Sequence, residues 1–361
     1  MKGKFYSLKN ILKTNAVYNV VFGGRSNGKS YAVHDYGIRR YWEKHEQMAI
    51  IRRYRDDFTG KRGVQMFDNQ SYTGNIKRIT GGVWDSVYYW RSAWYLSRRD
   101  ENGELVHDEN PFCYGFALSA MEHDKSTSYP NVTTVLFDEF ITRSIYLNDE
   151  FVTFMNVLST IIRHRTNVKI FMIGNTVNKY CPYFKEMGLT HVKDMREGDI
   201  DVYRYGDSDL RVAVEYSVNK VGKESSMYFA FDNPKLSMIT GSAWEIDLYP
   251  HCPVKYKPKD ILMIYFIQFD DACMQCEIVN TGETLFTFIH KKTTPIQNPD
   301  KDIIYTPEYN PRPNYSRKIT KPVYEWQKKI YWFFQSERVY YQDNETGEVI
   351  RNYLNWCNSA K

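Results

Sequence analysis

Cysteines, long apolar runs and low-complexity segments are all scarce in this sequence. The 361 residues include six cysteines, at positions 113, 181, 252, 273, 276 and 357, which is too sparse a set for a disulfide framework. No apolar run approaches the ~18–20 residues of a membrane span, and the basic N-terminus lacks a following apolar signal segment. We therefore expect reduced thiols in a soluble, intracellular protein.

The sequence also lacks a large excess of positive or negative charge. The formal net charge is +5, a mild basic excess that permits nucleic-acid contact without requiring it. A single C-x-x-C, Cys273 to Cys276, has no second pair beside it, so we expect two small side chains on a strand rather than the alternative, a structural zinc site. At ~100–200 residues per domain, the length predicts two domains.

What the sequence does contain is a glycine-rich motif at residues 18–30, which read YNVVFGGRSNGKS. An apolar run precedes a match to G-x-x-x-x-G-K-[ST], and residues 30–44 are suited to a helix, the context expected of a phosphate-binding loop rather than an ordinary strand-to-helix turn. Lys29 would reach the β- and γ-phosphates, and Ser30 would offer its hydroxyl to Mg²⁺. The predicted nucleotide-binding residues are Gly23, Gly24, Arg25, Ser26, Asn27, Gly28, Lys29 and Ser30.

A second motif lies at residues 131–140, which read NVTTVLFDEF. Its apolar residues predict a central strand of a parallel sheet that ends in Asp138 and Glu139, which is the pattern of a Walker B motif. Asp138 is suited to hold the Mg²⁺ shell together with Ser30, and Glu139 to polarise the water that attacks the γ-phosphate.

The next two predicted elements are a helix at residues 151–164 and a strand at residues 168–173. Asn175 follows that strand, and a polar side chain there would touch both the γ-phosphate and the attacking water. Arg163 and Arg165 lie at the end of the helix, from where either could reach a neighbouring subunit's nucleotide as an arginine finger. The alternative is a pair of solvated arginines favoured by the helix dipole.

The identity of the nucleotide base can be inferred from a motif that the sequence lacks. Guanine is read by N-K-x-D, but Asn178 and Lys179 are followed by Tyr180 and Cys181. The glutamate directly after the Walker B aspartate also points to the ATPase branch of these proteins. The sequence therefore predicts ATP and Mg²⁺ as cofactors.

Three further stretches carry weaker signals. The arginine cluster at residues 52–55, after a strand at 48–51, would bring cations near a nucleotide or DNA backbone, or form a solvated turn with Arg–Asp pairs. Residues 83–96 are rich in Trp and Tyr, and a turn at 100–103 separates them from a later apolar run, which predicts an antiparallel excursion with a hairpin. Its aromatic side chains would either pack within half-buried strands or stack on nucleic-acid bases. Residues 206–256 are polar and predict a linker, whereas residues 257–361 predict three strands and a helix at 323–334.

Taken together, four segments resemble the DNA-packaging ATPases of phi29-type small podophages: GGRSNGKSYAV, IIRRYR, LSAMEHDKSTSYPNVTTVLFDEF and IIRHRTNVKIFMIGN. The resemblance implies an α/β P-loop NTPase domain of the additional-strand, catalytic-glutamate class at residues 1–205. It also implies a linker at 206–256 and a smaller RNase H-like α+β domain at 257–361, without nuclease activity, that binds nucleic acid or the portal. The acid-free run at 261–269 agrees with a lack of cleavage, because related nucleases hold two metals with clustered carboxylates.

The resemblance also assigns roles to single residues. Asn175 falls at the family's coupling residue, Arg163 at its trans-acting arginine finger, and Lys125 at a lysine near the subunit interface. Arg55 stands where the family pattern has lysine, which keeps the charge.

The hypothesis that these observations favour is a homo-oligomeric ring, a pentamer by the resemblance, that hydrolyses ATP and drives double-stranded DNA into a preformed capsid. Its partners would be the DNA, further copies of the chain and the phage portal, at the portal vertex in the host cytoplasm and without a membrane. Whether a structural packaging RNA is also a partner stays open. The alternatives are a helicase-like P-loop ATPase acting on free DNA and a non-motor ATP-switch adaptor.

Overall fold

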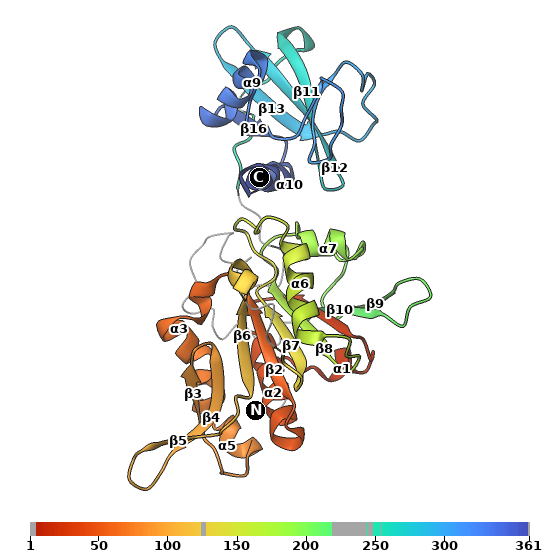
Figure 1. Ribbon diagram of the computed structural model, residues 1–361. Helices are drawn as coiled ribbons and strands as arrows, with labels where there is room; N and C mark the ends of the chain where they lie inside the picture. The colour runs from red at the N-terminus through yellow and green to blue at the C-terminus, as the bar shows by residue number, and fades with distance from the viewer. Residues whose placement is uncertain (1–4, 124–127, 219–243, 245–247, 253, 360–361) are drawn as a thin grey trace. The chain divides into compact units, whose positions relative to one another are not determined.

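A computed structural model describes residues 5–123, 128–218, 244, 248–252 and 254–359. The chain divides into two compact units (Figure 1). The first comprises Met1–Arg143 and Asp149–Trp244, and the second comprises Ser144–Asn148 and Glu245–Lys361. Within the described residues, no helix is long and apolar enough to cross a membrane.

The first unit is built on one ten-stranded sheet in the described part of the chain. Its path runs β3-β4-β6-β2-β7-β8-β1-β10-β9, with β5 paired to β4. Six neighbouring strands are parallel: β6 (Cys113–Ala117), β2 (Gln47–Arg52), β7 (Val132–Asp138), β8 (Lys169–Asn175), β1 (Tyr18–Gly23) and β10 (Arg211–Ser217). Antiparallel strands flank them: β3 (Ser86–Trp90), β4 (Ala93–Arg99), β5 (Leu105–His107) and β9 (Ile200–Arg204).

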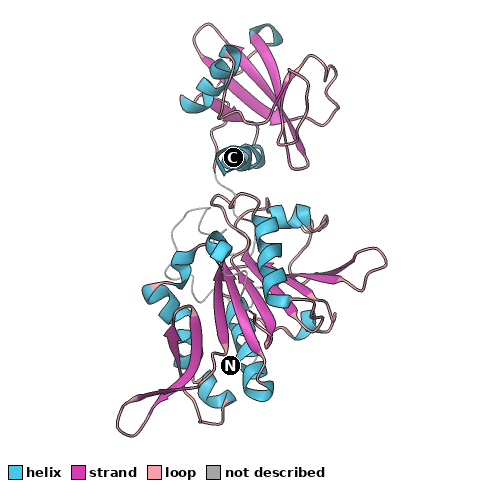
Figure 2. Cartoon of the chain, in the orientation of Figure 1, coloured by secondary structure: helices cyan, strands magenta, loops and turns pink. Residues whose placement is uncertain are grey.

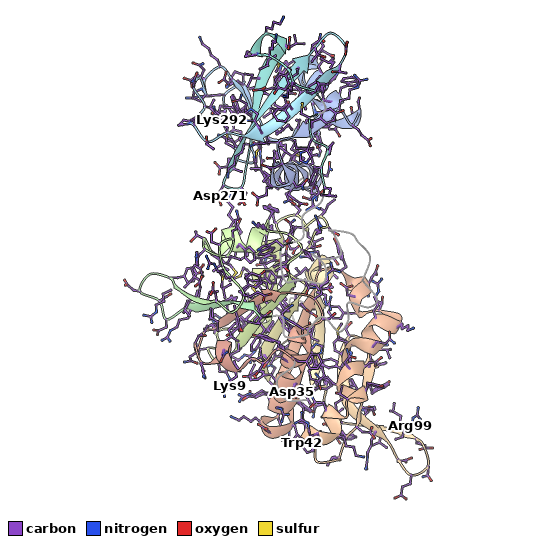
Figure 3. All side chains as sticks on the ribbon, turned by 180° about the vertical axis from the view of Figure 1, so that it is seen from behind. Lys9, Asp35, Trp42, Arg99, Asp271 and Lys292 are labelled. Atoms are coloured by element: carbon purple, nitrogen blue, oxygen red, sulfur yellow. The ribbon has the colours of Figure 1, made fainter. Side chains whose placement is uncertain are left out.

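Helices cover both faces of the parallel strands, which explains why those strands are apolar on both sides. Helix α2 (Lys29–Lys44) packs on β2, β7 and β8, and lies nearer the viewer in Figure 3, where Asp35 and Trp42 mark it. On the other face, Phe154 of α6 (Glu150–Ile162) stacks on Phe137 of β7. The shorter helices are α1 (Lys9–Leu12), α3 (Gly60–Val64), α4 (Asp68–Tyr72), α5 (Asn75–Ile79) and α7 (Pro182–Glu186), with 3₁₀ turns at Arg55–Phe58, Gln65–Phe67 and Leu118–His123.

This sheet confirms the predicted mostly parallel α/β fold, but it corrects one domain limit. Residues 206–217 were predicted to begin the linker, whereas β10 pairs with β1 along its whole length and its residues 212–217 are buried. The prediction failed because polar residues at 206–209 precede a strand whose partner residues are 194 positions away in the sequence, as in the pair Tyr18 and Val212. Most of the remaining predicted linker lies outside the described residues.

The aromatic run at residues 83–96 is two strands and not one. β3 and β4 are joined by a two-residue turn at Arg91 and Ser92. Trp94 and Leu96 are fully buried, so on that face the packing alternative is confirmed.

The second unit contains a six-stranded sheet in its described residues, in the order β15-β14-β11-β12-β13-β16 (Figure 2). The three predicted strands form its antiparallel meander, and three short strands add in parallel at the edges. The strands are β11 (Ile261–Phe269), β12 (Ala272–Asn280), β13 (Leu285–Lys291), β14 (Ile303–Tyr305), β15 (Tyr315–Ser316) and β16 (Val339–Tyr341). With α9 (Glu325–Gln335), α10 (Asn344–Ser359) and a 3₁₀ turn at Pro258–Asp260, the second unit combines helices and a mixed sheet, as predicted for an α+β domain.

The cysteines of the described chain form no disulfide. Cys276 is buried within β12. Among the described residues, no group of three or more histidine, cysteine or acidic side chains could hold a metal ion.

Candidate nucleotide site

The phosphate-binding loop follows β1 and begins α2, as the motif predicted. Gly23 and Gly28 adopt φ values of 152° and 90°, which side chains with a β-carbon rarely adopt. A Cβ on Gly23 would also lie 2.3 Å from Ser217 Oγ at the end of β10. Ser217 accepts a hydrogen bond from Asn27 Nδ2 at 2.9 Å and donates one to the carbonyl of Phe22 at 3.0 Å, so β10 braces the loop from behind.

Lys29 points into the loop from the first turn of α2. Its Nζ donates to the carbonyl oxygens of Gly23 and Gly24 at 3.2 and 2.7 Å and to Asn175 Oδ1 at 3.2 Å. Burial lowers the pKa of this amine to about 8, although the nearby Asp138 carboxylate opposes the shift. Three neutral oxygens therefore hold a buried cation where phosphate oxygens would compete for it.

The residues predicted to hold Mg²⁺ lie side by side. Ser30 Oγ donates to Asp138 Oδ1 at 3.1 Å, across the gap between α2 and the end of β7. A hydroxyl and a carboxylate are the hard oxygen ligands that Mg²⁺ prefers, so this pair fits the ion. Asp138 is 5% exposed, and such a burial of a carboxylate requires a cation beside it.

In this structure that cation is Arg52, the last residue of β2. One guanidinium nitrogen lies 2.9 Å from Asp138 Oδ2 and the other lies 2.7 Å from Glu139 Oε2. Neither interpretation of the arginine cluster predicted that Arg52 pairs with both carboxylates, because the sequence does not show that β2 lies next to β7. The only available signal was that both strands end in charged residues of opposite sign.

Arg53 fixes the backbone on which Glu139 stands. Its guanidinium pairs with Glu150 at 2.8 Å and donates to the carbonyls of Glu139 and Phe140 at 3.2 and 3.1 Å. Glu150 also accepts a hydrogen bond from the Tyr183 hydroxyl at 2.9 Å. Glu139 has a φ of 61°, which costs on the order of 1–3 kcal/mol for a residue with a β-carbon, and the bonds from Arg53 hold it there.

A cavity of about 590 Å³ lies at the phosphate-binding loop. Lys29, Ser30, Asp138, Glu139 and Asn175 all face it, so the structure brings the predicted phosphate, metal and water-activating residues together. The cavity extends to four side chains that the sequence argument did not name, Phe5, Tyr31, Asn69 and Thr73.

Of these four, Phe5 belongs to a lead-in segment tied to the loop. The amide of the adjacent Tyr6 donates to the Asn27 carbonyl at 2.9 Å, and the Tyr6 hydroxyl donates to Glu215 at 2.7 Å. No motif marks this segment, since its position depends on β10 pairing with β1.

The remaining predicted residues lie in different settings. Ser26 is exposed at the tip of the loop and also lines the cavity, whereas the exposed Arg25 does not line it. Arg163 is exposed at the end of α6 with a φ of 42°. Lys125 lies outside the described residues. Arg165 is different, because its guanidinium donates to backbone carbonyls at residues 129, 130, 132, 161 and 162, which holds it against its own subunit.

Comparison with known families shows which family the chain belongs to. The family model described as Podovirus DNA encapsidation protein (Gp16) matches residues 1–73 and 104–221, which is more than half of the sequence. The chain belongs to this family. The matched segments carry the phosphate-binding loop, the Walker B strand and Asn175, whereas β3 and β4 fall in the gap between them.

Curated relatives of this Gp16-family chain come from Bacillus phages. It is 28% identical over 186 residues to the DNA packaging protein of Bacillus phage phi29, and 29% identical over 189 residues to that of Bacillus phage B103. These alignments cover 51% and 50% of this chain and 50% of each relative. The chain therefore spans about half the length of the curated relatives it matches.

Two solved structures share the fold over almost the whole chain. The bacteriophage Phi-29 viral genome packaging motor assembly gives a TM-score of 0.55 at 20% identity and covers 97% of both chains. The Phi-28 gp11 DNA packaging motor gives a TM-score of 0.50 at 19% identity, covering 99% of this chain and 98% of that one. At these identities the likeness establishes the two-domain fold.

Proposed function

We propose that this protein hydrolyses ATP and couples the hydrolysis to the movement of double-stranded DNA into a preformed capsid. The observation that carries the proposal is that Lys29, Glu139 and Asn175, from three separate strand ends, line one cavity. Membership of a DNA encapsidation family supports the choice of DNA as the cargo. The curated relatives, which are DNA packaging proteins, support it too.

The roles of the cavity residues follow from their positions. Lys29 would exchange its bonds to Gly23 and Gly24 for phosphate oxygens, and the loop amides would bind the remaining phosphate charge. Ser30 and Asp138 would hold Mg²⁺, which supplies charge neutralisation at the transferring phosphate when it is bound. Asn175 already contacts Lys29 and would report the state of the γ-phosphate to β8.

Glu139 would polarise the attacking water once it separates from Arg52. While the two are paired, the guanidinium occupies Glu139 Oε2, so this oxygen is not available to a water molecule. Hydrolysis therefore requires a rearrangement in which Glu139 turns towards the water, and its 64% exposed side chain has the space to do so. The sequence alternatives, a helicase-like enzyme on free DNA and an ATP-switch adaptor, have no separate observation in their favour.

The finer parts of the proposal concern assembly. Arg163 would act in trans on a neighbouring subunit's nucleotide in a homo-oligomeric, pentameric ring, because Arg165 is bound to its own backbone and Arg163 is exposed. Lys125 would lie near the same interface. The ring would sit at the portal vertex in the host cytoplasm, and the second unit would bind nucleic acid or the portal without cutting DNA, since β11 contains no carboxylate.

The experiment is an ATPase assay against protein concentration, with and without duplex DNA. We expect DNA-stimulated turnover whose specific rate rises with protein concentration as rings form. Lys29→Ala and Glu139→Gln should both abolish turnover, but Glu139→Gln should still bind ATP because Glu139 acts mainly on water. Glu104→Gln, an exposed acid in the loop before β5, is the matched control. Near-normal turnover in Glu139→Gln would contradict the assignment.

A further inference from the structure

A second pocket lies along β6 in the first unit, away from the nucleotide cavity. It has a volume of about 390 Å³ and is lined by Arg55, Arg91, Tyr114, Ala117 and Tyr129, among others. Arg55 follows β2 and Ala117 ends β6, so one end of the pocket lies at the carboxyl edge of these parallel strands, where α/β sheets bind their ligands. Strands β6 and β1 are four positions apart in the sheet, which separates this pocket from the phosphate-binding loop by roughly 19 Å.

Two arginines, Arg55 and Arg91, line this pocket. In the described chain neither Arg55 nor Arg91 lies within 4.0 Å of a carboxylate, although Arg52 and Arg53 beside them are both paired. Like charges that line one pocket repel each other unless an anion lies between them. A guanidinium group presents a planar fork of donors that matches the oxygens of a phosphate.

The turn that carries Arg91 is held in an unfavourable conformation. Arg91 and Ser92 are the two residues of the β3–β4 turn, and both have positive φ values, 46° and 58°. Such turns favour Asn-Gly, because residues with a β-carbon are strained there. The Gly115 amide donates to the Ser92 carbonyl at 2.7 Å and anchors the turn on β6. Retained strain of this kind is typical of functional positions.

Arg91 is also oriented by its own strand. Its guanidinium carbon lies 4.6 Å from the centre of the Trp90 ring, a cation–π contact that limits the freedom of the side chain. The whole β3–β4 hairpin falls in the gap between the segments that the family model matches. The family match therefore does not extend to Arg91.

We propose that Arg55 and Arg91 form a phosphate-binding site separate from the nucleotide site. The ligand is a phosphate group, supplied either by the backbone of duplex DNA or by a free polyphosphate. The proposal goes beyond the ATPase assignment and does not depend on hydrolysis, because none of its residues lines the nucleotide cavity.

The test uses the full chain in a Lys29→Ala background, so that the nucleotide site contributes little phosphate binding. Affinity for a short duplex DNA is measured over a series of salt concentrations, and affinity for inorganic pyrophosphate is measured by calorimetry. If the DNA backbone is the ligand, Arg91→Ala should weaken binding of any DNA sequence and lower the salt slope by about 1. Arg91→Lys should retain the slope, because it retains the charge.

Arg98→Ala is the matched control, since Arg98 is an exposed arginine of the same hairpin that does not line the pocket. Its neighbour Arg99 is labelled in Figure 3, where β4 continues into the projecting hairpin that it forms with β5. Loss of pyrophosphate binding with an unchanged DNA slope would assign the site to free polyphosphate. An Arg91→Ala chain that binds both probes as its parent does would overturn the proposal, and Arg55→Ala provides the same comparison if Arg91→Ala fails to fold.

Discussion

Arg52 and Glu139 form an ion pair of 2.7 Å, and the same guanidinium binds Asp138 at 2.9 Å. Both carboxylates line the nucleotide cavity. One cation therefore pairs with both carboxylates that we propose for metal binding and water activation. Burial tends to lower the pKa of Arg52, but Asp138 and Glu139 raise it, and the result lies above the ordinary value. Arg52 stays charged at every pH at which the protein is folded.

The first prediction concerns metal affinity at this pair. Mn²⁺, used as a spectroscopic substitute for Mg²⁺, should bind several-fold more tightly to Arg52→Gln than to the parent chain, because the guanidinium no longer competes for Asp138. Electron paramagnetic resonance of free Mn²⁺ measures this. Arg62→Gln, whose side chain is 71% exposed, is the control. Equal affinity in Arg52→Gln and the parent would show that the ion pair does not restrict the metal site.

The second prediction concerns pH. Lys29 has a pKa of about 8 in the empty site, so it loses its proton as the pH rises through 8. Phosphate favours the charged amine, and nucleotide binding should therefore take up a proton above pH 8 and weaken by about tenfold per further pH unit. Calorimetric titrations of ADP between pH 7 and 9.5 measure both effects. A flat affinity over this range would mean that Lys29 is fully charged throughout.

The third prediction concerns the buried pair Arg53 and Glu150. Removing one partner leaves an uncompensated buried charge, so Arg53→Met should lower the free energy of unfolding of the first unit by about 3–5 kcal/mol. Arg53→Met combined with Glu150→Leu should recover most of that loss. Urea unfolding followed by tryptophan fluorescence checks both variants. A double variant as unstable as the single one would show that Arg53 acts through its bonds to Glu139 and Phe140.

The fourth prediction is that Arg163 acts in trans. Loss of a trans finger removes charge stabilisation at the γ-phosphate and costs on the order of 10³–10⁵ in rate in GTPases, with little loss of nucleotide affinity. Arg163→Ala subunits keep their own Lys29, and Lys29→Ala subunits keep Arg163. Mixed rings therefore contain some intact interfaces, and ATPase activity should partly return.

The control for this mixture is a demonstration that the rings form and exchange subunits. Arg165→Ala should instead lower stability, because Arg165 binds five backbone carbonyls of its own subunit. A mixture as inactive as its two components would exclude the trans role of Arg163.

The sequence by itself determined the local chemistry of the nucleotide site. The glycines at 23 and 28, Lys29, Ser30 and the acids after β7 are fixed by short motifs, because each role needs one residue type at one spacing along a single turn or strand end. The strands and helices that carry them were predicted to within a few residues, since apolar periodicity is a local signal.

Only the tertiary structure decided which charged side chains lie next to each other. The neighbours β2 and β7 bring Arg52 to Asp138, and β10 brings Ser217 behind the loop, although about 80 to 190 residues separate these partners. The same holds for Arg55 and Arg91, which face one pocket because a hairpin is anchored on β6. Strand order in a sheet is set by the packing of the whole domain, and no local pattern of residues encodes it.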